Sequence, residues 1–596
     1  MNLFDTADFY INRIVTSRSK SKLTITEQSK IKALLLDKDT ISTISMCATQ
    51  SELLDHGIYF VDTIENEGRD VMRHIKCMVY VKPSDETINH LLKELQNPKY
   101  GEYYIYFNNK VNKSQLERLA ESDDLEVVSK IEEIFQDYQI LNEDLFSLDL
   151  PSKSLFMNNM IWDELGLESC TQSVISLLLS LKLKPDIVFE LNSKLCSRLA
   201  KEIAYEIETN EKALFDFSKR DSPPLLVLLD RKNDPLTPLL QPWTYQSMIK
   251  EYIDIKRNLV DLSKVPDIDK ELMKVTLSSK QDPFFMDTMY LNFGELGDKV
   301  KKYVATYRDK TNSNNQINTM EDIKNFIEKY PEFRKLSGNV AKHMAIVGEL
   351  DRQLKTRDIW ELSELEQNIS VHDDNQDDFQ QIIRLVTDQE NKLSSFYKLK
   401  LACIYAVRHG DKNKARVDEL VKLLASSNFS NEDIDFFHHF NSSFNGKNIA
   451  NVDLLDGVDG SVSQSKDKDD LLSELAKRFN TRMGRGDSIK KSGNIADNVY
   501  MQHVPNISEL LSELSKNKLH VNKKYKYYGK SNTHKNSVRP PPQDVIIFVV
   551  GGVTFEESRL VHEYNETMKT SGGNIRLILG GTNMLTTEEF MNSVRK

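Results

Sequence analysis

The sequence contains few cysteines and no segment typical of secretion. Its 596 residues include five cysteines, an odd number, and their scattered spacing forms neither a disulfide framework nor a CxxC metal pair. A reducing compartment fits this composition best. The amino terminus carries acidic residues and no basic region, which indicates the start of a helix and not a signal peptide.

Long apolar runs and a basic field are also absent. A membrane-spanning helix needs about 20 apolar residues, whereas the best candidate, 169–181, is ended by Lys182 and Lys184 and is typical of a buried helix. The formal net charge of -11 argues against nonspecific nucleic-acid binding, which needs a positive field. The composition therefore predicts a soluble, cytoplasmic protein, and its length predicts several domains.

The chain has none of the common catalytic signatures. It lacks the GxxxxGK[ST] phosphate loop, the GxSxG nucleophile turn and the HExxH zinc pair. Two features still leave an enzyme as the alternative. Asp230 and Asp234 follow an apolar strand, where a doubly wound sheet often binds ligands, so they indicate a nucleotide- or metal-dependent phosphoryl-transfer site. The alternative is structural: Asp230 caps the next turn or pairs with Arg231. The glycine pairs 551–552 and 580–581 also follow strands, as phosphate loops do, but a tight strand-to-helix turn explains them as well.

The first region, residues 1–138, alternates apolar strands with helical stretches. Such alternation predicts a doubly wound α/β domain. The expected strands are 31–36, 78–81 and 103–107, and the expected helices are 85–95, 114–119 and 125–135.

The second region is predicted to be split. Apolar strands are expected at 186–189 and 225–229, and two more appear only at 545–550 and 575–579, with a helix over 554–568 between them. Two lone strands cannot bury both faces, so they are expected to complete the sheet that begins before residue 230. The second α/β domain then comprises 139–240 and 497–596, and it carries an inserted third domain, 241–496.

The inserted segment is almost wholly helical by its apolar spacing of three and four residues. Two low-complexity stretches, 457–466 and 483–493, are typical of flexible loops. A basic, aromatic linker over 522–535, before the prolines 540–542, is either a solvated loop or a contact for an anionic membrane.

The run Leu228–Met248 (LLDRKNDPLTPLLQPWTYQSM) resembles the signature of the Sec/Munc (SM) family of syntaxin-binding proteins. Agreement continues at 289–297, 330–344, 548–557 and 579–582, so the resemblance covers essentially the whole chain. It is greatest for the vacuolar-protein-sorting branch that acts between Golgi and endosome, in a fungal form. The resemblance implies a three-domain arch of class α/β plus α, with two doubly wound parallel-sheet domains and a large helical insertion in the second.

The resemblance also implies a function. Proteins of this family have no catalytic centre or cofactor; they chaperone SNARE assembly in vesicle fusion by binding a syntaxin-type SNARE. We therefore expect a monomer without enzyme activity, cofactor or metal, held peripherally on Golgi, endosome or vacuole membranes through its SNARE partner. A passive scaffold that binds SNAREs without changing their assembly rate is a further alternative.

Two binding surfaces follow from the resemblance. The first is an apolar pocket for the amino-terminal peptide of the syntaxin, and the second is a helical hairpin that templates SNARE helices. Because Leu116 and Leu119 are spaced one turn apart, as are Val128 and Ile131, two helices are expected to form the pocket, with Glu133 as an acidic rim; core burial of all four apolar residues is the alternative. The hairpin residues implied are Pro331 as the hinge, then Phe333, Leu336, Val340, Met344 and Val347 as a stripe.

One position departs from the family pattern. Members that grip a closed syntaxin carry a basic residue in the loop after the first strand. Asp37 of the central cleft is present here, but residues 39–43 contain no Lys or Arg. The sequence therefore does not predict a tight grip on closed syntaxin.

Overall fold

The computed structural model describes residues 1–16, 31–158, 161–218, 220–253, 255–266, 268–314, 320–388, 392–427, 429–444, 498–519, 521, 523–529 and 541–595. For residues 158, 304, 306–314 and 320–337, the structure describes the backbone but not the side chains. The predicted loops 457–466 and 483–493 and most of the predicted linker lie outside these residues. Within the described parts, every helix is too short or too polar to cross a membrane.

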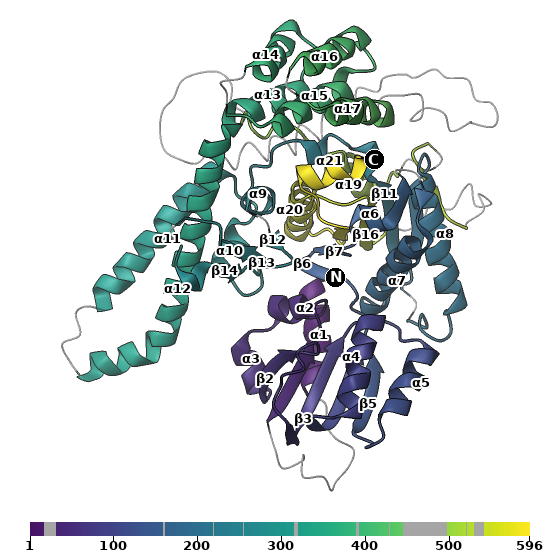
Figure 1. Cartoon of the computed structure of the whole chain (residues 1–596), viewed down its shortest axis with the longest axis vertical. Coiled ribbons are helices and arrows are strands. Elements are labelled where there is room, and N and C mark those ends of the chain that lie inside the picture. The colour runs from purple at the N-terminus through teal and green to yellow at the C-terminus, as the bar shows by residue number, and fades with distance from the viewer. Residues whose placement is uncertain are drawn as a thin grey trace. The chain divides into compact units, whose positions relative to one another are not determined.

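A five-stranded parallel sheet forms the amino-terminal part of the chain, in the order β2-β1-β3-β4-β5. Successive strand residues point to opposite faces: Leu34 and Leu36 pack with α1, whereas Ala33 and Leu35 pack with α4 and α5. The sheet is therefore doubly wound, as predicted (Figure 1, purple to blue). Its elements are α1 (Leu3–Val15), β1 (Lys32–Leu36), α2 (Ile41–Cys47), α3 (Gln50–Asp55), β2 (Ile58–Thr63), β3 (Met72–Val81), α4 (Asp85–Gln96), β4 (Tyr100–Phe107), α5 (Lys113–Ser122) and β5 (Val128–Glu133).

The prediction of a helix over 125–135 is wrong. Val128–Glu133 forms β5, which pairs in parallel with β4 at the edge of the sheet. The edge strand β2 was not predicted, because its exposed apolar residues Tyr59, Phe60 and Val61 show no alternation.

A second, seven-stranded sheet joins strands from distant parts of the sequence. Its order is β15-β10-β11-β16-β17-β7-β6, and only the two outer strands, β15 and β6, are antiparallel to their neighbours. The late strands thus extend the sheet begun before residue 230. Its strands are β6 (Gln139–Asn142), β7 (Leu145–Ser147), β10 (Asp186–Glu190), β11 (Leu225–Asp230), β15 (Tyr525–Tyr527), β16 (Asp544–Val550) and β17 (Arg576–Gly581), and its main helices are α7 (Glu164–Ser180), α8 (Lys194–Thr209) and α20 (Phe555–Ser571).

Strand β15 lies where a linker was predicted. Tyr525 is fully buried and β15 pairs with β10 over Tyr525–Tyr527. This part of the predicted basic linker is therefore the edge of a sheet and not a loop.

Glycine 580 is required by packing in this sheet. It stands between Phe548 and Phe146 on the neighbouring strands, and a Cβ at this position would lie 2.1–2.4 Å from atoms of the Phe146 ring. The rings of Phe146 and Phe548 stack across it, with centroids 6.2 Å apart. The glycine pair 580–581 is therefore explained by close packing within the sheet.

The chain forms two compact units. The first comprises Met1–Asp230, Thr244–Glu349 and Tyr525–Met584, and it contains the two large sheets and two smaller ones. Its remaining elements are α6 (Ser152–Leu155), β8 (Phe156–Asn158), β9 (Ile161–Trp162), α9 (Tyr245–Tyr252), β12 (Ile255–Lys256), β13 (Leu259–Asp261), β14 (Lys274–Thr276), α10 (Pro283–Thr288), α11 (Phe293–Asn314) and most of α12 (Met320–Arg357).

The second unit comprises Arg231–Trp243, Leu350–Lys524 and Leu585–Lys596. It is helical, and its interior holds Trp243 against Trp360 and Tyr500, with ring centroids 4.6 and 4.7 Å away. Its helices are α13 (Ile359–Val371), α14 (Gln376–Thr387), α15 (Ser395–His409), α16 (Lys414–Ser426), α17 (Asn431–Phe444), α19 (Ile507–Ser515) and α21 (Thr587–Val594). Two sheets flanked by helices and a helical remainder confirm the predicted class, α/β plus α; the three domain boundaries stay a prediction.

Candidate functional site

Helix α5 supplies the first half of the predicted pocket. It begins after Asn112, whose side chain accepts a hydrogen bond from the backbone N–H of Gln115, while the Gln115 side chain accepts one from the Asn112 N–H. This capping box fixes the first turn. The apolar residues Leu116 and Leu119 then face the sheet.

Strand β5 supplies the second half, and a bulge decides which side chains face α5. Val128 is level with Tyr103, but Lys130 is level with Tyr104, so the register shifts by one residue. After the shift, Ile131 is level with Ile105 and Glu133 with Phe107. In-register residues of neighbouring strands point to the same face, so Val128, Ile131 and Glu133 all lie on the face that α5 covers.

The five predicted pocket residues therefore share one side of the sheet but differ in exposure. Leu119 is 1% exposed and belongs to the core. Leu116 and Val128 are partly buried against the same core, and Ile131 is 39% exposed. Of the four apolar residues, Leu116, Val128 and Ile131 are thus accessible to a partner, and we call these three residues the α5–β5 apolar surface.

Polar groups frame this surface. Glu133 Oε1 accepts a hydrogen bond of 2.8 Å from the Val111 backbone N–H, which holds its carboxylate beside α5. Asp123, which the sequence did not single out, accepts from the backbone N–H groups of Val127 and Val128 at 2.9 and 3.0 Å. It thereby fixes the start of β5. The surface has an acidic edge and suits an apolar peptide with a cationic side chain.

The predicted hairpin residues lie on α12, a single helix that runs through Pro331. The side chains of Pro331, Phe333 and Leu336 lie outside the described residues. Farther along, the predicted stripe divides: Val340 is buried, Val347 is partly buried, and Met344 is 49% exposed. In this half of the helix, the buried positions recur mostly every three or four residues: Val340, His343, Ile346, Glu349, Leu350 and Leu354.

A buried hydrogen-bonded chain holds the described part of α12. Tyr245 Oη and His343 Nδ1 lie 2.9 Å apart, and His343 Nε2 lies 2.9 Å from Asp282 Oδ2, which Lys342 also contacts. Burial lowers the pKa of His343 below its ordinary value. Burial alone would raise the pKa of Asp282, but His343 and Lys342 outweigh it and hold that pKa well below its usual range. The sequence did not predict this group, because its members are far apart in the chain.

Asp37, predicted at the central cleft, is fully buried. Its Oδ1 accepts from the N–H groups of Asp39 and Thr40, and its Oδ2 accepts from the N–H of Lys82 at 2.6 Å. Burial raises the pKa of the Asp37 carboxyl despite these hydrogen bonds. The side chain therefore orders the loop after β1 and does not face a partner.

A basic side chain does reach this loop, from a residue that the sequence did not single out. Arg257 lies between β12 and β13 in a left-handed conformation (φ 61°). Its guanidinium donates one hydrogen bond to the Lys38 carbonyl and another, of 2.8 Å, to Asp39 Oδ1. Its Nε lies 3.2 Å from Asp149 Oδ2. The guanidinium is thus engaged by two carboxylates.

The two acids proposed for the alternative enzyme site, Asp230 and Asp234, form hydrogen bonds with other residues of the chain. Asp230 accepts from the Ser193 hydroxyl at 2.6 Å. Asp234 accepts from the N–H and hydroxyl of Thr237, the first residue of the short turn Thr237–Leu239, at 3.2 and 2.8 Å. These contacts favour a structural role for both acids.

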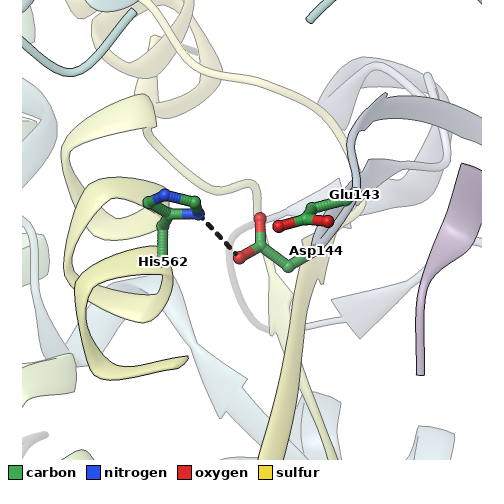
Figure 2. Close-up of side chains that lie close together, drawn as sticks. All are labelled: Glu143, Asp144 and His562. Atoms are coloured by element: carbon green, nitrogen blue, oxygen red, sulfur yellow. Dashed lines mark hydrogen bonds and ion pairs between the residues drawn. The ribbon is translucent and has the colours of Figure 1, made fainter. Parts of the chain in front are cut away.

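The described residues include one cluster that can hold a metal ion, formed by Glu143, Asp144 and His562 (Figure 2). It lies where the β6–β7 turn meets α20, and the sequence did not predict it.

Comparisons with known proteins agree along the whole chain. A model of the Sec1 family matches residues 32–593. Vacuolar protein sorting-associated protein 45 of Saccharomyces cerevisiae is 59% identical over 598 residues, covering 100% of both chains. The human protein of the same name is 36% identical and covers 95% of this chain and 92% of its own. A solved structure of the SM protein Vps45 in complex with the Qa SNARE Tlg2 has 36% identity and a TM-score of 0.81, covering 100% of this chain and 98% of that one. On this similarity in sequence and fold, the chain belongs to the Sec1 family.

Proposed function

We propose that this chain is an SM-type regulator and chaperone of SNARE assembly, which acts in vesicle fusion between Golgi and endosome or vacuole by binding a syntaxin-type SNARE. The observation that carries this proposal is the 59% identity, over the full length, with a yeast vacuolar protein sorting-associated protein 45. A 36% identical Vps45 has been solved in complex with a Qa SNARE, which supports the same class of partner here.

The α5–β5 apolar surface is the proposed site for the amino-terminal peptide of that SNARE. Leu116, Val128 and Ile131 present accessible apolar groups on one face, and Glu133 gives an acidic edge for a basic peptide residue. Leu119 supports this surface from the core and does not itself meet the peptide.

Helix α12 is the proposed SNARE template. A helix that continues through Pro331 is what an extended form of the hairpin requires, and it supports this proposal. Within the predicted stripe, Met344, which is 49% exposed, is the described residue most available to a partner helix, while Val340 is buried and anchors α12.

We also propose that the protein works as a monomer, without catalysis and without a cofactor. It stays at Golgi, endosome or vacuole membranes through its SNARE partner. A grip on closed syntaxin is not part of the proposal, since residues 39–43 of the loop after β1 contain no Lys or Arg, and the Arg257 guanidinium that reaches this loop is already held by Asp39 and Asp149.

Peptide affinity tests the proposed pocket. Full burial of a leucine side chain contributes about 1.5–3 kcal/mol, and Leu116→Arg removes that burial and places a charge in the pocket. We expect a loss of peptide affinity of about a hundredfold or more, measured by fluorescence anisotropy with a labelled amino-terminal syntaxin peptide. Because Leu116 is partly exposed, the variant should fold, which thermal melting checks.

Glu121→Arg is the matched control. Glu121 is exposed on the same helix, five positions away, and turns to a different side. It should bind the peptide as the wild type does. Equal affinities for Leu116→Arg and wild type would refute the pocket assignment.

A further inference from the structure

Three potential metal ligands converge at the end of the seven-stranded sheet. Glu143 and Asp144 form the turn between β6 and β7, and His562 lies on α20; Figure 2 shows their side chains pointing toward one another. One ligand atom from each residue lies within 4.8 Å of the others. The side chains of Glu143 and His562 are 37% and 24% exposed, whereas that of Asp144 is 7% exposed, so Asp144 forms the floor of an accessible cluster.

One oxygen of Asp144 lacks a hydrogen bond. Oδ2 accepts from His562 Nδ1 and from Asn565 Nδ2 at 3.3 and 3.1 Å. Oδ1 is buried and accepts from none of the residues that the structure describes. A buried carboxylate oxygen without a partner is unfavourable, and a cation bound by both oxygens of Asp144 supplies the missing interaction.

The spacing between Asp144 and His562 also fits a metal. Charge-assisted hydrogen bonds between nitrogen and carboxylate are usually about 2.7–2.9 Å long, and the distance here is 3.3 Å. Two ligands of a tetrahedral zinc ion, each bound at about 2.0–2.1 Å, lie about 3.3 Å apart. This pair therefore needs almost no movement to bind an ion, and only Glu143 must approach.

Outer contacts orient all three ligands. Asn565 is fixed by hydrogen bonds of 2.9 Å in both directions with the backbone of Leu577. Asn2 Nδ2 donates to Glu143 Oε2 at 3.0 Å, and the Tyr290 ring packs on the His562 ring with centroids 4.9 Å apart. Such supporting contacts are typical of metal sites.

Lys569 is the competing cation. Its Nζ lies 3.8 Å from Glu143 Oε1, but its side chain is 62% exposed and also pairs with Glu566 at 2.6 Å. Lys569 can therefore leave Glu143 when an ion binds.

We propose that Glu143, Asp144 and His562 bind one divalent transition-metal ion of the zinc class, with water completing the coordination. One imidazole and two carboxylates suit zinc better than magnesium, which prefers oxygen ligands alone. The bound ion joins the β6–β7 turn to α20 across 418 residues of sequence and stabilises the folded state of the first unit. This site is independent of the proposed SNARE function.

Zinc titration of the chelator-treated full-length protein tests the proposal, with a chromophoric chelator as competitor at neutral pH. The wild type should bind one tightly held zinc ion, and excess magnesium should not displace it. His562→Gln and Asp144→Asn should each weaken binding by about tenfold or more. His438→Gln, at an exposed histidine of α17, is the control and should bind as the wild type does.

X-ray absorption at the zinc edge of the wild-type protein gives a readout that does not depend on any variant folding. We expect nitrogen and oxygen ligands with one imidazole and no sulfur. Absence of a stoichiometric ion, a sulfur ligand, or full binding by both His562→Gln and Asp144→Asn would overturn the assignment.

Discussion

Replacing Pro331 by alanine perturbs the proposed template at one position. Pro331 lies inside α12, eleven residues after its first residue, Met320, and proline has no N–H to donate within a helix. Pro331→Ala restores that donor and removes a ring of a kind that, in any helix interior, clashes with the carbonyl four residues earlier. The substitution therefore favours the continuous helix over any form in which the chain bends at this point.

The expected size follows from helix propensity. Proline in a helix interior is about 3 kcal/mol less favourable than alanine, and about 1.4 kcal/mol corresponds to a factor of ten in an equilibrium. If residue 331 leaves the helix in the bent form, the ratio of extended to bent hairpins rises about a hundredfold. If the extended hairpin makes up a few per cent of the wild-type protein, it would then become the main form in Pro331→Ala.

SNARE assembly followed by fluorescence energy transfer is the assay, with Gly338→Ala as the matched control. Gly338 lies seven residues farther along α12, and a Cβ there meets nothing within 4 Å, so the change stabilises the helix by about 1 kcal/mol without touching the hinge. Pro331→Ala should accelerate assembly several-fold, and Gly338→Ala should not. Equal rates for Pro331→Ala and wild type, or equal acceleration by both variants, would refute the hinge.

Two further predictions concern stability. Gly580→Ala places a Cβ within 2.1–2.4 Å of the Phe146 ring and should lower the free energy of unfolding, measured in urea, by about 2 kcal/mol or more. Gly297→Ala is the control, because a Cβ there meets nothing within 4 Å, and it should not destabilise the protein. Equal effects of the two substitutions would contradict the packing argument. Burial, despite Asp282, keeps the pKa of His343 below its ordinary value, so the unfolded chain takes up this proton first as pH falls below about 6.5. The urea midpoint should therefore drop from pH 7.5 to 5.5, and less so in His343→Asn; an identical drop in both proteins would exclude His343 as the cause.

The wrong prediction of a helix over 125–135, near the candidate site, has a geometric explanation. Apolar residues three apart, Val128 and Ile131, indicated a helix because strand residues on one face normally differ by two. The bulge between Val128 and Lys130 inserts one residue, so positions three apart share a face of a strand. Val128 and Ile131 therefore share one face, as a spacing of three residues indicated, but they lie on a strand and not on a helix.

Other features needed the folded chain. The long apolar strands and the late pair at 544–550 and 576–581 could be predicted, because buried parallel strands are continuous apolar runs. The engagement of Arg257 by Asp39 could not be predicted, since nothing local links residues 218 positions apart. The cluster of Asp144 with His562 was hidden for the same reason.

The rate of SNARE complex formation with the cognate syntaxin-type SNARE, measured with and without the full-length protein, tests the central claim most directly. A chaperone that templates assembly should raise this rate, and Leu116→Arg should lose most of the effect. Binding of the SNARE with an unchanged rate would contradict the claim and leave a passive scaffold.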